Sequence, residues 1–422
     1  MLKFGLNCYP NFSILRSQSR KPPLPMIDIK KAIKMIEVEV GQLGAEKIEL
    51  SRSVGRVLAE NIIADTDLPP FDRSQMDGYA VVAEDTRPAP VALKIVGESA
   101  AGRGWHKTMK RGEAVRIMTG APVPVGADSV QKIEETNESG DEVEILEPTE
   151  KNRYIIRQGS EIKKGKTILK PGTRITENMI ATLAAFGYAK VKVTRSPRVS
   201  IIGTGSEIVE INKKPGRDQI RNSNSVMLDV LCRKFGATAT ILPNVKDEIS
   251  DLKSQISNAA KKSDIVILTG GVSVGKYDHT KTALVELEAT IFFEKVRLKP
   301  GKPAVFAKLG KTFIFGLPGN PVSAAVTFHL FVRKALLKMQ DANASNMQNG
   351  FAILTADVKA ARERDSYLPS RLETNKLGQL LAYPLKWSGS SDFIGFAQAD
   401  SLIFVPKGEG HKKDAVVEVA FL

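Results

Sequence analysis

The chain has 422 residues, of which 42% are hydrophobic and 26% are charged, and this composition is typical of a folded globular protein. A chain of this length exceeds what one hydrophobic core usually serves, so we expect several domains. Its formal net charge of +14 favours anionic partners. The basic residues are spread along the sequence without a Lys/Arg block, which argues against a nucleic-acid groove.

The cysteines and the apolar runs exclude two further classes of protein. Cys8 and Cys232 lie far apart and form no C-x-x-C pair, so we expect neither a disulfide framework nor a thiolate zinc site. A reducing, cytoplasmic compartment fits this pattern best. Pro, Gly or Lys interrupts each apolar stretch before about 18 residues, so we expect no membrane span.

Residues 1–25 differ from the rest of the chain because they contain several basic residues and several serines but no acidic residue. They resemble a transit peptide only weakly. We interpret them as a disordered basic extension, or as the result of a start codon assigned too early, with Met26 opening the folded part.

The first predicted element is a helix from Ile27 to Val40, because Ile29, Ala32, Ile33 and Ile36 share one helical face. Short β-rich runs separated by Gly and Pro turns then follow as far as Pro197. Examples are residues 92–96 and 114–118, and residues 159–176 repeat a strand and turn rhythm. We therefore expect residues 26–196 to form an N-terminal region of two β-rich subdomains.

From Arg198 the pattern changes to alternating strands and helices, which is typical of an α/β domain with a parallel sheet. Asn320 and Pro321 suit the N-cap and the first position of a helix that ends near Met339. We expect this domain over residues 197–340. Its predicted elements are strands at 199–202, 265–268 and 312–315, a helix at 225–235, a further helix after 268, and the helix after Asn320.

Residues 341–350 are polar and rich in turn-forming side chains, which suits a linker. Short strands such as 401–405 return beyond it. We expect residues 350–422 to form a C-terminal β-barrel-like domain. The predicted fold is thus a multidomain protein with a central α/β domain between β-rich modules.

Glycine-rich turns follow three of the predicted parallel strands. Such turns present free backbone N–H groups at the carboxyl edge of a sheet, where ligands of open α/β folds bind. A single turn of this kind is usually structural, but three of them predict an anion-binding crevice. The residues concerned are Gly203, Thr204 and Gly205, then Gly270, Gly271, Ser273 and Gly275, and finally Pro318 and Gly319.

Cations alternate along the segment before the last of these strands. Period-two spacing places Lys295, Arg297 and Lys299 on one face of an extended segment, and Lys302 follows shortly after. One interpretation is a binding surface for phosphate or another oxyanion. The other is a solvated edge strand, since lysines discourage edge pairing. The pattern favours neither interpretation over the other.

Four carboxylates, Asp65, Asp67, Asp72 and Asp77, lie in one loop of the N-terminal region. Their oxygens suit Mg²⁺, which would neutralise a diphosphate and assist its cleavage. Turns in which aspartates bind the backbone around Pro and Gly are the alternative, and the carboxylates alone favour it.

Seven long motifs occur in one order along the chain, and together they resemble the molybdopterin molybdenumtransferase family, which includes bacterial MoeA and the gephyrin E domain. The resemblance extends from about Ile27 to the C-terminus. The motifs are FDRSQMDGYAV, RIMTGAPVPVGADSV, GTGSEIV, QIRNSN, LTGGVSVGKYDHTKT, LKPGKP and GLPGNPVSA.

The resemblance implies a homodimer of four-domain subunits, whose active site lies between the α/β domain of one subunit and the N-terminal region of the other. It implies adenylylated molybdopterin and molybdate as substrates and Mg²⁺ as the required ion. The reaction would insert the metal into the dithiolene and release AMP and molybdenum cofactor.

The resemblance also assigns roles to residues of this sequence. Catalytic positions would be Asp77, Thr119, Glu207, Asp278, Lys295 and Lys299, with the two lysines on molybdate and phosphate oxygens. Glu161, Glu207 and Asp278 would contact the metal, and Glu207 and Asp278 would alternatively contact the pterin. Cofactor-binding positions would be the glycine-turn residues named above, Asn222, Lys302, Pro321 and Ser390, with Ser391 beside it.

The chain departs from the best-known members of the family at four positions, three in these motifs and one, Glu161, in the stretch GSEI at residues 159–162. Glu161 and Asn222 stand where those members have Asp, and Arg73 and Gln75 stand where Asn and Ala are commonest. Asn222 supplies no negative charge, which argues against a metal ligand or a proton acceptor there.

Two alternative functions follow from these patterns. A non-catalytic pterin-binding scaffold would explain the lost carboxylates, and a molybdopterin adenylyltransferase would use a similar α/β domain by itself. The long flanking domains favour the molybdenum-inserting transferase. Its protein partners would be the adenylyltransferase that supplies the substrate and the molybdoenzymes that receive the product.

Overall fold

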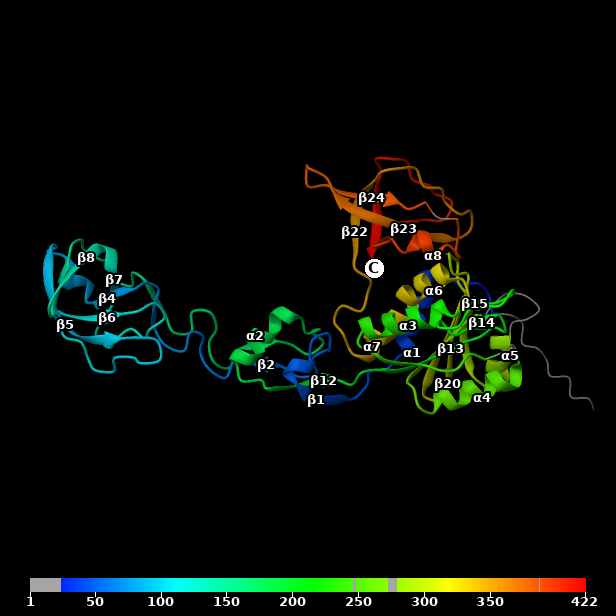
Figure 1. The fold of residues 1–422 in the computed structure, drawn as a ribbon, viewed down its shortest axis with the longest axis horizontal. Helices are drawn as coiled ribbons and strands as arrows, with labels where there is room; N and C mark the ends of the chain where they lie inside the picture. The colour runs from blue at the N-terminus through cyan, green and yellow to red at the C-terminus, as the bar shows by residue number, and fades with distance from the viewer. Residues whose placement is uncertain (1–23, 246–247, 272–278, 387) are drawn as a thin grey trace, which may run out of the picture. The chain divides into compact units, whose positions relative to one another are not determined.

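The computed structural model describes residues 24–245, 248–271, 279–386 and 388–422, and Figure 1 shows its ribbon. Most of the predicted basic extension lies outside these residues. The described chain divides into two compact units. One contains Gln42–Ser196 and Met339–Asn343, and the other contains the residues up to Gly41, Pro197–Lys338 and Ala344–Leu422.

The unit formed by residues 42–196 is rich in short strands, because Gly and Pro turns interrupt its sequence every few residues. Its largest sheet has the order β7-β4-β6-β5-β9-β8. In β4, the second strand of this order, Tyr79 and Val81 lie in one buried cluster and Ala80 in another, so the sheet is covered on both faces. The strands are β4 (Gly78–Val81), β5 (Val91–Ser99), β6 (Glu113–Ile117), β7 (Ser129–Lys132), β8 (Thr136–Ser139) and β9 (Glu142–Ile145).

The same unit has a second, smaller core in which Leu58, Ile62, Leu183 and Val191 pack together. One helix and two strand pairs surround this core. These elements are α2 (Glu177–Ala185), β1 (Ala45–Glu49) with β12 (Lys190–Thr194), and β2 (Ile62–Ile63) with β11 (Thr167–Leu169), while β3 (Arg73–Ser74) pairs with β10 (Ile155–Ile156).

The α/β domain of the other unit contains a six-stranded sheet of order β16-β13-β17-β21-β20-β18. The first four strands are parallel, and β20 is antiparallel to both of its neighbours. Strands buried on both faces read as continuous apolar runs, as Ile265–Leu268 does. The strands are β13 (Arg198–Gly203), β16 (Thr238–Ile241), β17 (Ile265–Thr269), β18 (Thr290–Lys295), β20 (Pro303–Leu309) and β21 (Thr312–Leu317), and a short pair, β14 (Ile208–Val209) and β15 (Ile220–Arg221), follows β13.

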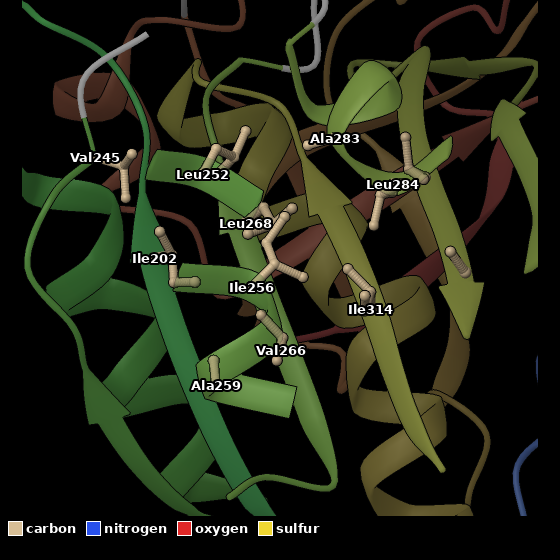
Figure 2. Close-up of a cluster of buried hydrophobic side chains, with 12 residues drawn as sticks. Ile202, Val245, Leu252, Ile256, Ala259, Val266, Leu268, Ala283, Leu284 and Ile314 are labelled. Carbon is tan, nitrogen blue, oxygen red and sulfur yellow. The ribbon is translucent and has the colours of Figure 1, made fainter. Parts of the chain in front are cut away.

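Helices cover both faces of this sheet (Figure 1). Helix α4 (Ile249–Ala260) presents Leu252, Ile256 and Ala259, which are spaced for one helical face, to the side chains of β13, β17 and β21 (Figure 2). Helix α5 (His279–Glu286) adds Ala283 and Leu284 to the same core. Helix α3 (Ser223–Lys234) contacts β13 and α6, and α6 contacts β21.

The helix predicted after Asn320 extends to Met339, but its middle is a π-helical turn. It consists of α6 (Pro321–Thr327), the π-turn η4 (Phe328–Val332) and α7 (Arg333–Met339). Helix α1 (Ile29–Glu39) contacts this π-turn. Within the described ranges, no helix is both long and apolar enough to cross a bilayer.

The C-terminal residues form a closed β-barrel. The strand order is β19-β23-β24-β22-β26-β25, and the additional pairing of β25 with β23 closes a ring of five strands, β23 to β25. Leu354, Ile403, Val405 and Val419 are among the side chains buried inside it. The elements are β22 (Asn349–Leu354), β23 (Asp365–Thr374), β24 (Leu380–Pro384), α8 (Phe393–Phe396), β25 (Ser401–Val405) and β26 (Val416–Phe421), and β19 (Leu298–Lys299) of the α/β part pairs with β23.

The predicted fold class is confirmed, with a central α/β domain, β-rich modules and a closed C-terminal barrel. The main difference lies at residues 159–176, where the predicted strand rhythm yields one three-residue strand, β11. Gly159, Gly165 and Gly172 adopt positive φ angles there, so turns break the extended backbone. The four-part division of the sequence stays a prediction.

Ile256 offers a test of the α4 core because its side chain is fully buried. We expect Ile256→Ala to reduce the free energy of unfolding by about 2–5 kcal/mol, since it removes apolar contacts and leaves a cavity. Val285→Ala on α5 is the control, because Val285 is 59% exposed and should change stability by less than about 0.5 kcal/mol. Chemical denaturation followed by circular dichroism measures both, and equal losses would contradict the assigned packing.

Candidate functional site

The glycine turns lie side by side at the carboxyl edge of the parallel sheet. The backbone N–H of Thr204 donates to Thr269 O at 2.9 Å, and that of Gly270 donates to Leu317 O at 3.3 Å. Gly270 has φ +92°, and a Cβ there would lie 2.3 Å from the carbonyl oxygen of Thr204. Only glycine fits this position, so the close approach of the strand ends depends on it. We call these strand ends, residues 203–205, 269–271 and 317–319, the glycine edge.

A cavity of about 640 Å³ lies between the α/β domain and the barrel of the same unit. Four of its lining residues are cationic and none is acidic. No ion pair to any of these four cations is found among the described residues. We call it the cationic pocket, and it is lined by Lys299, Pro300, Gly301, Lys302, Pro303, Pro318, Asn320, Ser323, Lys359, Arg364, Leu368, Ser388, Gly389 and Ser390.

Strand pairing and one loop bring the two sides of the cationic pocket together. Leu298 of β19 pairs with Asp365 of β23, which carries Lys299 to the barrel. On the other side, the N–H of Val322 donates to Ser390 O at 3.1 Å, and Asn320 Nδ2 donates to Ser390 Oγ at 2.7 Å. Asn320 occupies the predicted N-cap position of α6, but its side chain makes no cap hydrogen bond and bonds Ser390 instead.

Asp392 fixes the loop that carries Ser388 and Ser390. Its carboxylate accepts from the N–H of Gly395 at 2.9 Å and from the N–H of Ser388 at 2.8 Å. These bonds, with that of Gly395 first, lower the pKa of Asp392. The serine side of the pocket is thus held by a carboxylate that stays ionised.

The structure separates the three alternating cations of the 295–299 segment. Burial alternates along the segment, because Val296 and Leu298 are buried, Lys295 and Arg297 are half-buried and Lys299 is exposed. Arg297, however, forms an ion pair with Asp28 at 3.2 Å, and Lys295 does not line the cationic pocket. Lys299 reaches the pocket together with Lys302, Pro318 and Ser390 of the other predicted site residues.

Sequence reasoning missed the barrel's contribution to this pocket. Lys359 and Arg364 lie about 60 residues from Lys299 along the chain, outside every recognised motif. No local pattern signals them, because their position depends on the β19–β23 pairing.

Asn222, one of the predicted cofactor ligands, has both side-chain groups engaged in the protein. Its Oδ1 accepts from the N–H of Ser225 at 3.0 Å and caps α3, and its Nδ2 donates to Asn244 Oδ1 at 2.6 Å. By contrast, three buried polar atoms near the glycine edge have no hydrogen-bond partner among the described residues. They are Asn224 Oδ1, Ser225 Oγ and Thr280 Oγ1.

The other predicted residues of the α/β domain are placed only in part. Glu207 is exposed, and its carboxylate lies 2.4 Å from where a Cβ on Gly205 would stand. Pro321 begins α6. Ser273, Gly275 and Asp278 lie outside the described residues. The predicted pairing of Asp278 with Glu207 in one site therefore stays a prediction.

In the unit of residues 42–196, Asp77 and Thr119 contact each other directly. Asp77 Oδ1 accepts from the N–H of Thr119 at 2.6 Å and from its hydroxyl at 2.9 Å. These two bonds, the backbone one first, lower the pKa of Asp77. Both side chains are exposed, so this pair offers an ionised carboxylate and a hydroxyl to solvent.

The neighbouring carboxylates of the loop bind protein groups. Asp67 accepts from the N–H of Lys164 and Asp72 from that of Gln158, both at 2.8 Å. These donors lie 97 and 86 residues further along the chain, so the two bonds are not the local turns that the carboxylates alone favoured. Glu161 lies 3.4 Å from Arg73, so two departures from the family pattern contact each other. Among the described residues, no group of three His, Cys, Asp or Glu side chains is arranged to hold a metal ion. These carboxylates alone do not supply a Mg²⁺ site.

In the part of the chain that the structure describes, the glycine edge has buried hydroxyls without partners and lies next to a pocket of four cations without ion pairs. This arrangement is typical of α/β proteins with sites suited to anionic ligands. Comparison with known families agrees. Residues 27–187 match the MoeA N-terminal region (domains I and II), residues 200–338 match a probable molybdopterin-binding domain, and residues 352–422 match the MoeA C-terminal region (domain IV). The chain belongs to the MoeA family, the molybdopterin molybdenumtransferases.

Individual relatives cover nearly the whole chain. Molybdopterin molybdenumtransferase of Staphylococcus epidermidis is 34% identical over 93% of this chain and 95% of its own length. That of Staphylococcus aureus is 34% identical over 94% and 96%. A crystal structure of the molybdopterin biosynthesis MoeA protein from Pyrococcus horikoshii OT3 is 31% identical, with a TM-score of 0.81 over 94% of this chain and 100% of that one. These relatives favour the transferase over the scaffold and adenylyltransferase alternatives.

The pair formed by Asp77 and Thr119 gives a prediction about pH. In Thr119→Val the hydroxyl bond is lost and the backbone bond remains, so we expect the pKa of Asp77 to rise towards its usual value without reaching it. The pKa of Asp77 is lower in the folded state than in the unfolded state, where it is about 3.9. The pair therefore stabilises the fold above pH of about 3.9, and this stabilisation is lost as the pH falls through the folded-state pKa of Asp77.

A pH titration of the Asp77 carboxyl carbon by NMR measures this shift. Thr119→Ser is the control, because it keeps the hydroxyl and should keep the lowered pKa. The same pKa in wild type and Thr119→Val would show that the hydroxyl bond is absent in solution.

Proposed function

We propose that this protein inserts molybdate into adenylylated molybdopterin and releases AMP and molybdenum cofactor. The cationic pocket is the observation that carries the proposal. Molybdate is a tetrahedral dianion, and four cations without acidic neighbours supply the charge and the N–H donors that such an anion requires.

Lys299, Lys302 and Arg364 take the central roles on this proposal. Arg364 offers a planar fork of donors that binds two oxygens of one anion, while the lysines act as point charges. Ser323 and Ser390, which also line the pocket, add hydroxyl donors. The pocket thus combines charge with directional hydrogen bonds.

The glycine edge is proposed to hold the pterin nucleotide. The backbone N–H of Gly271 suits its diphosphate, and the oxygens of Ser225 and Thr280, which have no hydrogen-bond partner among the described residues, suit further polar groups. The edge and the cationic pocket share Pro318. Cleavage of the diphosphate increases the negative charge on the leaving AMP, which nearby lysines stabilise more strongly than the ground state.

The remaining predicted residues keep the roles that the family resemblance suggests. Asp77 and Thr119 are proposed to act in the site of a partner copy within a homodimer, because they lie in the N-terminal region. Lys295 is proposed to contact oxyanion oxygens, and Glu207 and Asp278 to contact the pterin or Mg²⁺. Mg²⁺ bound there would neutralise the charge of the diphosphate. The cytoplasm is the proposed compartment.

Molybdate-dependent release of AMP from adenylylated molybdopterin tests the proposed function. We expect Lys299→Ala and Arg364→Ala each to lower kcat/KM for molybdate about 10- to 100-fold, the loss typical of a removed charged hydrogen bond. Lys311→Ala is the matched control, because Lys311 is an exposed lysine of the same unit outside the pocket and should leave the rate unchanged.

Wild-type turnover in both pocket variants would exclude the cationic pocket as the molybdate site. If the wild-type protein binds adenylylated molybdopterin but releases no AMP when molybdate and Mg²⁺ are added, the transferase activity itself is excluded.

A further inference from the structure

Asn224 joins three elements at the glycine edge. It is the second residue of α3, and only 8% of its surface is exposed. Its Nδ2 donates to Gly319 O at 2.7 Å and to Thr269 Oγ1 at 2.9 Å. Because Gly319 O is a carbonyl and can only accept, the donating atom of Asn224 must be its amide nitrogen. The side chain therefore ties helix α3 to the end of β17 and to the loop before α6.

The hydrogen bond from Asn224 to Gly319 connects Asn224 to the wall of the cationic pocket. Pro318 and Asn320 both line the pocket. Gly319, which accepts the hydrogen bond of Asn224, lies between them in the chain. Thr269 Oγ1 accepts a hydrogen bond from Asn224 and donates one to Pro318 O at 3.5 Å. Asn224 is thereby linked to the glycine edge on one side and to the wall of the cationic pocket on the other.

The other half of the Asn224 amide has no partner. Its Oδ1 is buried and accepts no hydrogen bond from any residue that the structure describes. A buried carbonyl oxygen without a donor costs free energy, and such atoms in folded proteins call for a specific explanation. Ser225 Oγ and Thr280 Oγ1, buried in the same region, also lack partners.

The two asparagines at the start of α3 thus differ in which side-chain atoms they leave available. Asn222 uses its oxygen for the helix cap and its nitrogen for Asn244. Asn224 uses only its nitrogen. The sequence motif suggests Asn222 as the cofactor ligand, while the hydrogen bonds leave only Asn224 with an acceptor for a ligand.

We propose that Asn224 recognises the pterin nucleotide, with Oδ1 accepting a hydrogen bond from an N–H or O–H donor of that ligand and Nδ2 holding the Pro318–Asn320 loop. The inference rests on the proposed function and deepens it by naming a binding and positioning residue. The donor belongs either to the pterin ring or to the ribose and adenine of the nucleotide, and both present the same chemistry to a carbonyl oxygen.

Isothermal titration calorimetry with two probes, metal-free molybdopterin and AMP, tests the inference on the full chain. We expect Asn224→Ala to weaken the binding of at least one probe about three- to tenfold, the effect of losing one neutral hydrogen bond. A loss confined to molybdopterin assigns the donor to the pterin, and a loss confined to AMP assigns it to the nucleotide. Either result supports the proposal.

Thr312→Val is the matched control for a structural effect. Thr312 is buried at the opposite end of the sheet, where its hydroxyl bonds the carbonyls of Ala260 at 2.7 Å and Ser263 at 2.9 Å. We expect this variant to lower the thermal midpoint, as Asn224→Ala does, while both probes bind within twofold of wild type.

Unchanged affinity for both probes in Asn224→Ala, with a lowered thermal midpoint like that of Thr312→Val, would reduce Asn224 to a structural residue and overturn the inference alone. If wild-type protein binds neither probe, the proposed function fails and the inference fails with it. The two failures are therefore distinguishable in one set of titrations.

Discussion

Parallel pairing of β13, β17 and β21 is the constraint on which the rest of this structure depends. Parallel strands in register end at the same edge, so the glycine turns that follow them in the sequence meet in space. Gly270 permits this meeting because its Cβ would overlap the carbonyl of Thr204. The same pairing brings Thr269 near Asn224 and Gly319. Buried side-chain oxygens without a hydrogen-bond partner among the described residues therefore gather at this edge without any long-range sequence signal.

The second constraint is electrostatic. Lys299, Lys302, Lys359 and Arg364 line one pocket, although like charges repel. Proteins usually offset such a cluster with carboxylates, and none lines this cavity. An anionic ligand removes the repulsion and gains charge-assisted hydrogen bonds, so the pocket selects for oxyanions. The net charge of +14 adds long-range attraction for the same ligands.

Acidic groups follow the opposite arrangement in the unit of residues 42–196. Asp67 and Asp72 accept hydrogen bonds from the backbone N–H groups of Lys164 and Gln158, and Glu161 is paired with Arg73. Asp77 differs because its partner, Thr119, is itself exposed and was singled out by a different motif. A carboxylate kept ionised by a threonine is suited to accept a hydrogen bond from a ligand. The role of this pair in a shared site remains part of the proposed function.

The sequence by itself determined the fold class, because continuous apolar runs such as Ile265–Leu268 identify buried parallel strands and helical spacing identifies Leu252, Ile256 and Ala259. It also determined the family, through motifs that are each contiguous along the chain. Tertiary structure alone decided which cations share a pocket. Arg297 turns to Asp28, whereas Arg364 arrives from the barrel through the pairing of β19 with β23. It also decided that Asn222 caps a helix while Asn224 keeps a free oxygen. Local patterns specify backbone conformation and burial, but the partners of a polar side chain depend on residues that are distant in sequence and become neighbours only when the chain folds.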